Sequence, residues 1–212
     1  MWNVNSIKSK KLELANYLSI NNLDIVAISE TKLNPKHRFS MPDYCVYHAD
    51  WNHFGGGVML LVKNNVRRDQ FVLPNVVNLE AIAVCLYLQN SILLLFVSCY
   101  NPPDSPVPYF DLNSLFSSLV LCCSSQWFEL QTYSLGFYLC WQKWSNTLIL
   151  LSQNIAINYP DNPTYFHTNF QTSVLDIALS KHRILSNPLS VLVHSSDHNL
   201  VVFKILLLPS IS

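Results

Sequence analysis

The sequence has little charge and no net charge. Only 12% of its 212 residues are charged, and thirteen basic residues balance thirteen acidic ones. A balanced total gives no sign of the counterion-release affinity that dominates most nucleic-acid binding. Half of the residues are hydrophobic, which is too apolar a composition for a disordered chain. We therefore expect one folded domain over residues 1–212, and charge alone does not suggest DNA.

Long hydrophobic runs, a secretory leader and CxxC cysteine pairs are also missing. The longest apolar runs, such as 92–97 and 148–151, fall short of the roughly 18 residues that a membrane-spanning helix needs. The first residues contain no positively charged stretch leading into an apolar one. The six cysteines are therefore expected to be reduced core thiols. We expect an intracellular protein without a membrane span.

Apolar runs that alternate with polar breaks do occur along most of the chain. Leucines at helical spacing between residues 12 and 18 predict a helix with Ser9 as its cap. A second helix is predicted over 109–121. The first strand ends at 3–5, and most of it is expected to be missing. Further strands are predicted at 23–28, 45–48, 57–62, 79–88, 91–100, 173–179, 189–194 and 200–208.

Four polar segments follow apolar runs, which places them at strand ends, where open α/β folds bind ligands. Taken singly each is weak, because an acid after a strand is usually a solvated loop residue. Hydrolysis of a phosphodiester needs a hard cation held by carboxylate and amide oxygens, a role that suits Glu30 and Asn3. The four segments are 2–5, 29–31, 98–103 and 195–199.

The same reaction needs a base for the attacking water, and a histidine oriented by an aspartate provides one near neutral pH. His198 is the candidate, with Asp197 beside it. Because adjacent side chains often point apart, Asp176 is the better candidate for the orienting acid. Tyr100, before an Asn-Pro-Pro turn, could donate to charge developing on the phosphate.

The order of these blocks resembles that of the endonuclease domain of non-LTR retrotransposons, which is similar to apurinic/apyrimidinic endonucleases and DNase I. The resemblance implies a four-layered α/β sandwich that binds Mg²⁺, with Mn²⁺ as an alternative, and nicks DNA to prime reverse transcription. A functional copy would act in the nucleus. The blocks are Asn3-Val4-Asn5, Ile28-Ser29-Glu30-Thr31, Gly55-Gly56-Gly57, Tyr100-Asn101-Pro102-Pro103, Pro163-Thr164-Tyr165-Phe166, Leu175-Asp176-Ile177 and Ser196-Asp197-His198.

The resemblance also implies a role for each matched residue. Asn3 lines the metal site, Glu30 ligates the metal, and Tyr100 contacts the phosphate. Asp176 supports the site, while Asp197 and His198 form the acid and the phosphate-facing histidine.

One block of that family, Gly-Asp-Phe-Asn, occurs nowhere in the sequence. Its Asp and Asn position the water and stabilise the transition state in the family. It is expected between the Pro-Pro turn and Pro163, where the composition also changes: only Glu129 and Lys143 are charged among residues 112–160. A shifted reading frame over 121–144 would explain both observations, since Gln126-Trp127 read one base later gives Ser or Asn followed by Gly. We interpret 121–144 as an aberrant segment.

Several features have plainer interpretations. Gly55-Gly56-Gly57 is best read as a hairpin entry, and the run of Lys8, Lys10 and Lys11 as a solvated helix start. The histidines other than His198 show no zinc spacing. Three functions remain open: an active Mg²⁺-dependent DNA endonuclease, an endonuclease-like fold that has lost activity, and a binding module built on the same fold with an apolar partner surface in 112–151.

Overall fold

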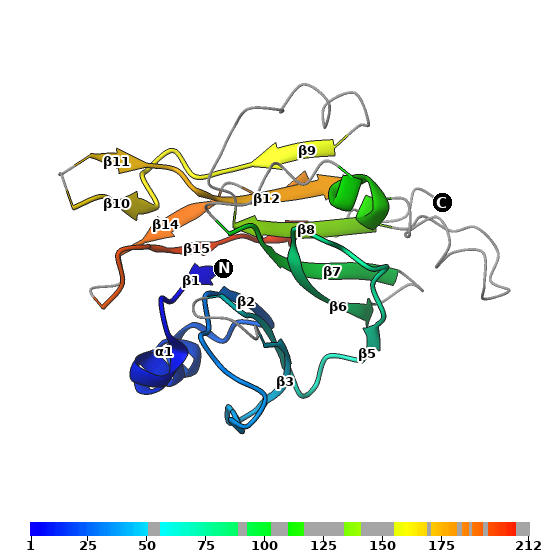
Figure 1. Ribbon diagram of the computed structural model, residues 1–212, viewed down its shortest axis with the longest axis horizontal. Coiled ribbons are helices and arrows are strands. Elements are labelled where there is room, and N and C mark those ends of the chain that lie inside the picture. Colours follow the sequence, from blue (N-terminus) through cyan, green and yellow to red (C-terminus); the bar gives the residue numbers. More distant parts are fainter. Residues whose placement is uncertain are drawn as a thin grey trace, which may run out of the picture.

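Two β-sheets packed face to face form the centre of the molecule (Figure 1). The computed structural model describes residues 1–50, 56–88, 93–102, 110–116, 134–140, 155–168, 171–181, 184–186, 188–192 and 195–206. The smaller sheet contains, in spatial order, β1 (Trp2–Asn3), β2 (Ile25–Ser29), β4 (Val58–Lys63) and β3 (Tyr44–Ala49). The larger sheet contains β5 (Arg68–Phe71), β6 (Glu80–Tyr87), β7 (Leu93–Tyr100), β8 (Ser134–Cys140), β12 (Asp176–Lys181) and β9 (Ile155–Asn158).

Three short antiparallel pairs complete the strands of the described residues. They are β10 (Tyr165–Phe166) with β11 (Thr172–Ser173), β13 (Ile184–Leu185) with β16 (Ile205–Leu206), and β14 (Leu189–Val191) with β15 (Leu200–Val202). β1 runs parallel to β2, and β7 parallel to β8, while the other pairs among these described strands are antiparallel.

Alternation of side chains along β4 explains how the smaller sheet is covered on both faces. Val58, Leu60 and Val62 belong to the core between the two sheets. Met59 and Leu61 point to the other face, where they join the core beneath the α1 helix (Ile7–Asn21). The strand reads as a continuous apolar run because both of its faces are buried.

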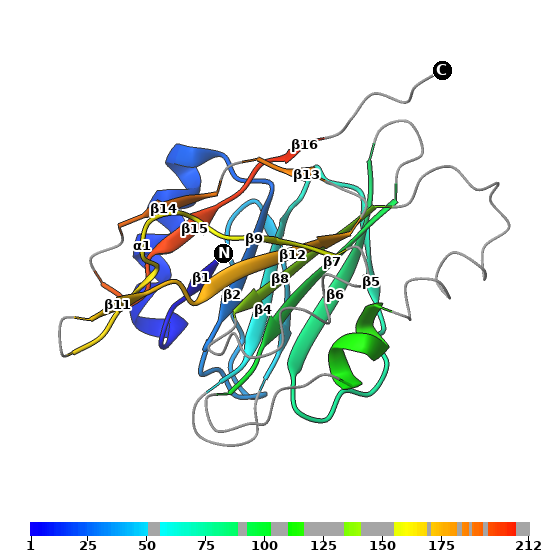
Figure 2. The ribbon, with the colours of Figure 1, turned by 90° about the horizontal axis from the view of Figure 1, so that it is seen from above.

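The larger sheet is covered in the same way. Ile82 and Val84 of β6 belong to the core between the sheets. Ala83 and Cys85 face outward, into a core that includes buried side chains of the helical residues 110–116. Figure 2 shows α1 outside the smaller sheet and this helical segment outside the larger one. The expected four-layered α/β sandwich is thus confirmed.

The α1 helix begins at a different residue from the one predicted, but it ends as predicted. Its N-cap is Ser6 and not Ser9, whose hydroxyl instead donates to the Ser6 carbonyl. Leu14 and Leu18 are buried as predicted, but Leu12 is 74% exposed because it lies on the solvent side of the helix. The predicted end is confirmed, since the C-cap Asn22 adopts a left-handed conformation.

The segment interpreted as aberrant contains part of the larger sheet. Residues 134–140 form β8, which lies between β7 and β12. The rest of 121–144, including Gln126-Trp127, lies outside the described residues. In the part of the chain that the structure describes, no helix is long and apolar enough to cross a membrane, and Cys45, Cys85 and Cys99 are free thiols.

Candidate active site

The smaller sheet delivers Asn3 and Glu30 to the same edge. β1 and β2 are parallel, with Asn3 opposite Ser29, so their carboxyl ends coincide and Glu30 follows directly. The Asn3 side-chain amide donates to Glu30 Oε1 over 2.7 Å. Asn3 is 2% exposed, whereas Glu30 is half-buried. The carboxylate is therefore fixed from the protein side and accessible from outside.

The larger sheet adds Tyr100 to this group. Tyr100 is the last residue of β7, and its phenol donates to the same Glu30 Oε1 over 2.9 Å. Because Asn3 and Tyr100 come from different sheets, the Glu30 carboxylate joins the two layers at their shared rim. Asn3, Glu30 and Tyr100 thus lie together, as predicted from their positions at the ends of strands.

A second polar group is the buried pair of Asp176 and His198. Asp176 begins β12, and its Oδ2 lies 2.9 Å from Nδ1 of His198. Asp176 is 0% exposed and His198 4%. Burial disfavours the charged imidazolium, but the Asp176 hydrogen bond and the neighbouring negative charges outweigh it, so the pKa of His198 is raised.

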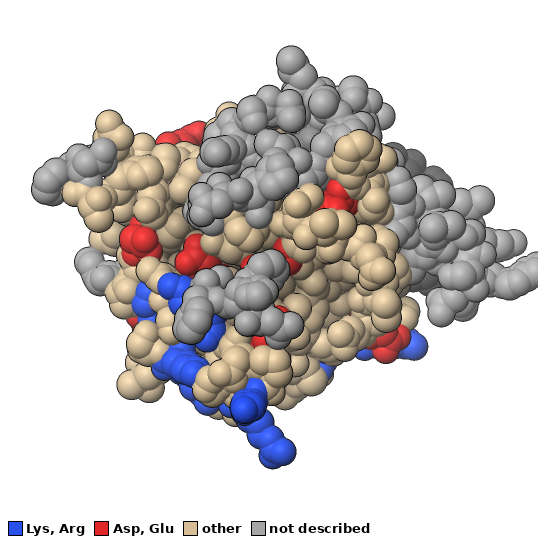
Figure 3. Space-filling model, in the orientation of Figure 1, with Lys and Arg blue, Asp and Glu red and all other residues tan. Residues whose placement is uncertain are grey.

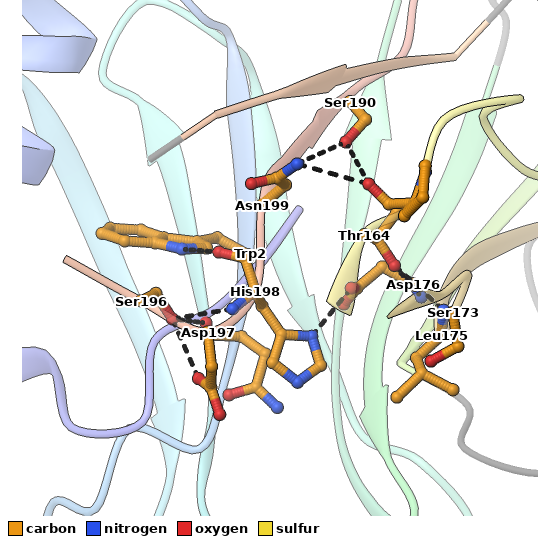
Figure 4. Close-up of polar contacts among 12 residues, drawn as sticks. Trp2, Thr164, Ser173, Leu175, Asp176, Ser190, Ser196, Asp197, His198 and Asn199 are labelled. Atoms are coloured by element: carbon orange, nitrogen blue, oxygen red, sulfur yellow. Dashed lines mark hydrogen bonds and ion pairs between the residues drawn. The ribbon is translucent and has the colours of Figure 1, made fainter. Parts of the chain in front are cut away.

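Thr164 holds this pair in place. Its buried hydroxyl oxygen accepts the backbone N–H groups of Leu175 over 2.9 Å and Asp176 over 3.1 Å. Its carbonyl accepts the N–H of Asn199, the neighbour of His198, over 2.7 Å. Figure 4 shows Thr164 beside Asp176, on the side away from the imidazole. Thr164 lies in the Pro163-Thr164-Tyr165-Phe166 block, and its residue type alone gives no indication of this role.

Asp197 does not orient the histidine. The side chain is exposed, and its Oδ1 accepts only a long hydrogen bond of 3.4 Å from Ser196, whose hydroxyl also donates to the Asn3 carbonyl over 3.0 Å. In Figure 4 the dashed line from the imidazole leads to Asp176 and not to Asp197. Asp197 nevertheless lies near enough for its charge to raise the pKa of His198.

The two polar groups share one rim of the molecule. The charge of Glu30 is among those that raise the pKa of His198. In the larger sheet, Tyr100 is the register partner of Cys140, and Cys140 is the partner of Asp176. The two groups are therefore set two strands apart, with the end of β8 between them.

Glu80 is a fourth acid at this rim that the sequence analysis missed. It begins β6 as the register partner of Tyr100, is 6% exposed, and accepts the backbone N–H of Gly57. Burial raises its pKa to about 7, and the nearby charge of Glu30 adds to the rise. In the sequence, Glu80 could have been noticed as an acidic residue at the start of an otherwise apolar strand.

The oxygen ligands at the rim suit a hard cation of the Mg²⁺ type. Glu30 offers a carboxylate and Asn3 an amide oxygen, whereas the described residues contain no cluster of three or more His, Cys, Asp or Glu that could hold a metal. Mg²⁺ is commonly held by one or two carboxylates together with waters and substrate phosphates. The donor chemistry therefore fits Mg²⁺ and not a closed zinc site.

One of the plainer interpretations changes in detail, while the other agrees with the structure. Lys10 is not solvated: it is 7% exposed, donates to the Val4 carbonyl, and lies over the Trp2 ring. Burial consequently lowers its pKa. Lys8 and Lys11 are exposed as predicted. Gly56 and Gly57 enter β4 as expected of a hairpin entry, while Gly55 lies outside the described residues.

The sequence and the fold were compared with those of known proteins. A model of the endonuclease/exonuclease/phosphatase family matches residues 2–119, and no curated protein matches the sequence. The solved endonuclease domain of TRAS1, a telomere-specific non-LTR retrotransposon, has a TM-score of 0.71 at 18% identity, covering 97% of this chain and 96% of that one.

Two further solved structures are similar. For the 3' phosphatase NExo from Neisseria, bound to product DNA hairpin, the TM-score is 0.62 at 15% identity, with 96% of this chain and 97% of that one covered. For an AP endonuclease from Leishmania major it is 0.66 at 12% identity, with 96% and 85% covered. At such identities the likeness shows a shared fold.

Proposed function

Because the chain belongs to the endonuclease/exonuclease/phosphatase family, we propose that it is a metal-dependent phosphodiesterase that nicks DNA, of the kind carried by non-LTR retrotransposons. The observation that supports this most directly is the gathering of Asn3, Glu30 and Tyr100 beside the Asp176–His198 pair. Glu30 supplies one carboxylate for a cation, and His198, which is 168 positions further along the chain, supplies one oriented imidazole.

The imidazole is prepared for contact with a phosphate or a water. Asp176 occupies Nδ1 of His198, which leaves Nε2 as the ring nitrogen for the substrate side. Because the pKa of His198 is raised, a larger share carries the second proton near neutral pH, and Nε2–H can then donate to a phosphate oxygen. Asp176 stabilises that charged form.

Glu30 and Asn3 would hold Mg²⁺, or Mn²⁺ in its place. A cation there would neutralise phosphoryl oxygens as charge builds up on them. The Tyr100 phenol, which donates to Glu30 in this structure, lies where it can also donate toward a phosphate bound beside that carboxylate.

A DNA partner agrees with the distribution of basic residues. Figure 3 shows Lys and Arg gathered over α1 and the segment after β2, next to acidic side chains near the rim. Lys8 and Lys36 are exposed there. A chain with no net charge thus presents a local basic surface to a polyanion.

We propose that this activity is reduced, since the Gly-Asp-Phe-Asn block is absent. The end of β8 is the strand position between Tyr100 and Asp176, and its last residue is Cys140, followed by Trp-Gln-Lys-Trp. Loss of a transition-state stabiliser commonly costs a factor of about 100 to 1,000 in rate.

Nicking of supercoiled plasmid in the presence of Mg²⁺ tests the proposal. Nicking that is abolished by EDTA and by Glu30→Ala, but retained in Asp161→Ala, would support it. Asp161 is an exposed acid in a different segment and serves as the matched control. If Glu30→Ala nicks as fast as the parent protein, the activity does not come from this site and the proposal is wrong.

The alternative is an inactive fold that binds DNA without cleaving it, which the missing block favours. Fluorescence anisotropy with a labelled duplex distinguishes the two. Binding that weakens with added salt, together with no nicking at any Mg²⁺ or Mn²⁺ concentration, would favour the binding module.

A further inference from the structure

Glu80 lies beside Tyr100, whose phenol donates to the Glu30 carboxylate. As the register partner of Tyr100 in an antiparallel pair, it shares the same face of the larger sheet. That face looks toward the smaller sheet, because Ile82 and Tyr100 both belong to the core between the sheets. A carboxyl group thus begins β6 at a buried position between the two layers, next to the phenol that contacts Glu30.

The Glu80 carboxyl group contacts the glycine segment that precedes β4. Its Oε2 accepts the N–H of Gly57, and its Oε1 has no hydrogen-bond partner among the described residues. A Cβ atom added at Gly56 would collide with this carboxyl, and one added at Gly57 would collide with Thr31 Oγ1. Both glycines also have positive φ angles, of 139° and 88°. Only glycine fits this close approach without strain.

The glycine segment in turn holds the backbone around Glu30. The Gly57 carbonyl accepts the N–H of Thr31 over 3.1 Å, and the Gly56 carbonyl accepts that of Lys32 over 2.8 Å. These bonds continue the pairing of β2 with β4 beyond Ser29 and Val58, its last register pair. A path of hydrogen bonds therefore leads from the Glu80 carboxyl to the two residues that follow Glu30.

The backbone of this segment is unfavourable without such support. Glu30 and Lys32 have φ angles of 52° and 51°, in the left-handed region that residues with a side chain seldom adopt. Conformations of this kind persist when surrounding contacts determine them. On the opposite side, Ser6 N–H donates to the Glu30 carbonyl over 2.8 Å. The glycine segment provides the second support.

We propose that Glu80 is a positioning residue for Glu30: its carboxyl group holds Gly56 and Gly57, which fix the backbone after Glu30 and thereby the direction of the metal-binding carboxylate. The inference rests on the proposed function only for the role of Glu30. The hydrogen-bond path itself can be tested without any activity.

Two substitutions separate the hydrogen bond from the charge. Glu80→Gln keeps an oxygen that accepts the Gly57 N–H but removes the charge, whereas Glu80→Leu removes the acceptor. Leu115→Ala is the control for general loss of stability, because Leu115 is fully buried in a different core cluster. Amide hydrogen exchange at Thr31 and Lys32, Mn²⁺ affinity by calorimetry, and the kcat and KM for plasmid nicking are measured for each.

Glu80→Leu is expected to speed exchange at Thr31 and Lys32 at least tenfold relative to Leu115→Ala. Misplaced ligands typically weaken metal affinity by roughly 10-fold to 100-fold, and kcat should fall while KM for DNA stays unchanged. Glu80→Gln should restore slow exchange and come within about threefold of the parent affinity.

Unchanged exchange at Thr31 and Lys32 in Glu80→Leu overturns the inference, as does Glu80→Gln exchanging as fast as Glu80→Leu. Failure of the proposed function looks different. In that case the parent protein neither binds Mn²⁺ nor nicks, while the exchange measurement still decides whether Glu80 holds the segment.

Discussion

The two halves of the candidate site are held by different means. One half contains Glu30, whose side chain is partly buried. It depends on an unusual backbone conformation, with positive φ angles at Glu30, Lys32, Gly56 and Gly57. The other half consists of a buried side-chain pair, and Thr164 supports its backbone through both its hydroxyl and its carbonyl oxygen. A substitution should therefore affect the first half through main-chain conformation and the second through an uncompensated buried charge.

The largest effect is expected from breaking the buried pair. Asp176→Ala removes the partner of His198 and leaves a buried imidazole unsatisfied, which should cost about 3–5 kcal/mol of the free energy of unfolding. Glu30→Ala, in the half-buried half, should cost less than about 1 kcal/mol. Urea denaturation measures both. Equal losses would show that the two halves do not differ in this way.

Restoring the missing Gly-Asp-Phe-Asn block should have the next largest effect, which is an increase in the rate of nicking. The combined substitution Trp141→Gly, Gln142→Asp, Lys143→Phe and Trp144→Asn places the family's four residues directly after β8. A gain in Mg²⁺-dependent nicking of about 100-fold to 1,000-fold is expected. The same four changes in a Glu30→Ala background are the control and should give no gain. If the restored protein nicks no faster than its parent, the absent block is not what limits activity.

A smaller effect is expected at the glycine segment. Gly57→Ala adds a Cβ that collides with Thr31 and forces alanine to a φ of 88°, so we expect a loss of roughly 1–3 kcal/mol. Thermal unfolding measures it. Thr31→Ser retains the hydroxyl but removes the methyl group, and it serves as the companion variant because it should lose little. A stable Gly57→Ala protein would contradict the close approach.

The smallest effect is a pH dependence. The folded state raises the pKa of Glu80 from 4.5 to about 7, so between these values it binds a proton that the unfolded chain has released. Stability due to this group therefore falls as pH rises through that interval. Relative to Glu80→Gln, the parent protein should lose roughly 1–2 kcal/mol between pH 5 and pH 8. If the difference in the free energy of unfolding between the two proteins does not change with pH, the raised pKa of Glu80 is excluded.

Much of the fold could be predicted because apolar periodicity reports burial. The central strands β4, β6 and β7 agree with the predicted ranges, since each is apolar on both faces. Leu12 was misplaced because helical spacing alone does not say which side of a helix meets the sheet. Ser9 failed as a cap because the chain enters the helix from the strand end, where Ser6 already has the non-helical conformation.

The site was predictable only as far as residue types reveal chemistry. Asn3, Glu30 and His198 follow apolar runs and are polar, so their positions could be read from the chain. Their hydrogen-bond partners required knowledge of which strands are neighbours. Glu80 was missed for that reason: its importance comes from pairing with Tyr100 and contacting Gly57, which are twenty or more residues away. The proposed roles of Asn3, Glu30, Tyr100, Asp176, Asp197 and His198 remain predictions.

The common register row through Glu80, Tyr100, Cys140 and Asp176 makes the site sensitive to strand length. A strand advances about 3.3 Å per residue, so a two-residue insertion within β8 would displace everything after Cys140 by about 7 Å while keeping its side chains on the same faces. Such a variant would retain its hydrophobic core and fold. A two-residue insertion inside these strands would therefore displace the site residues without unfolding the protein, whereas changes of length in the surface connections leave the row intact.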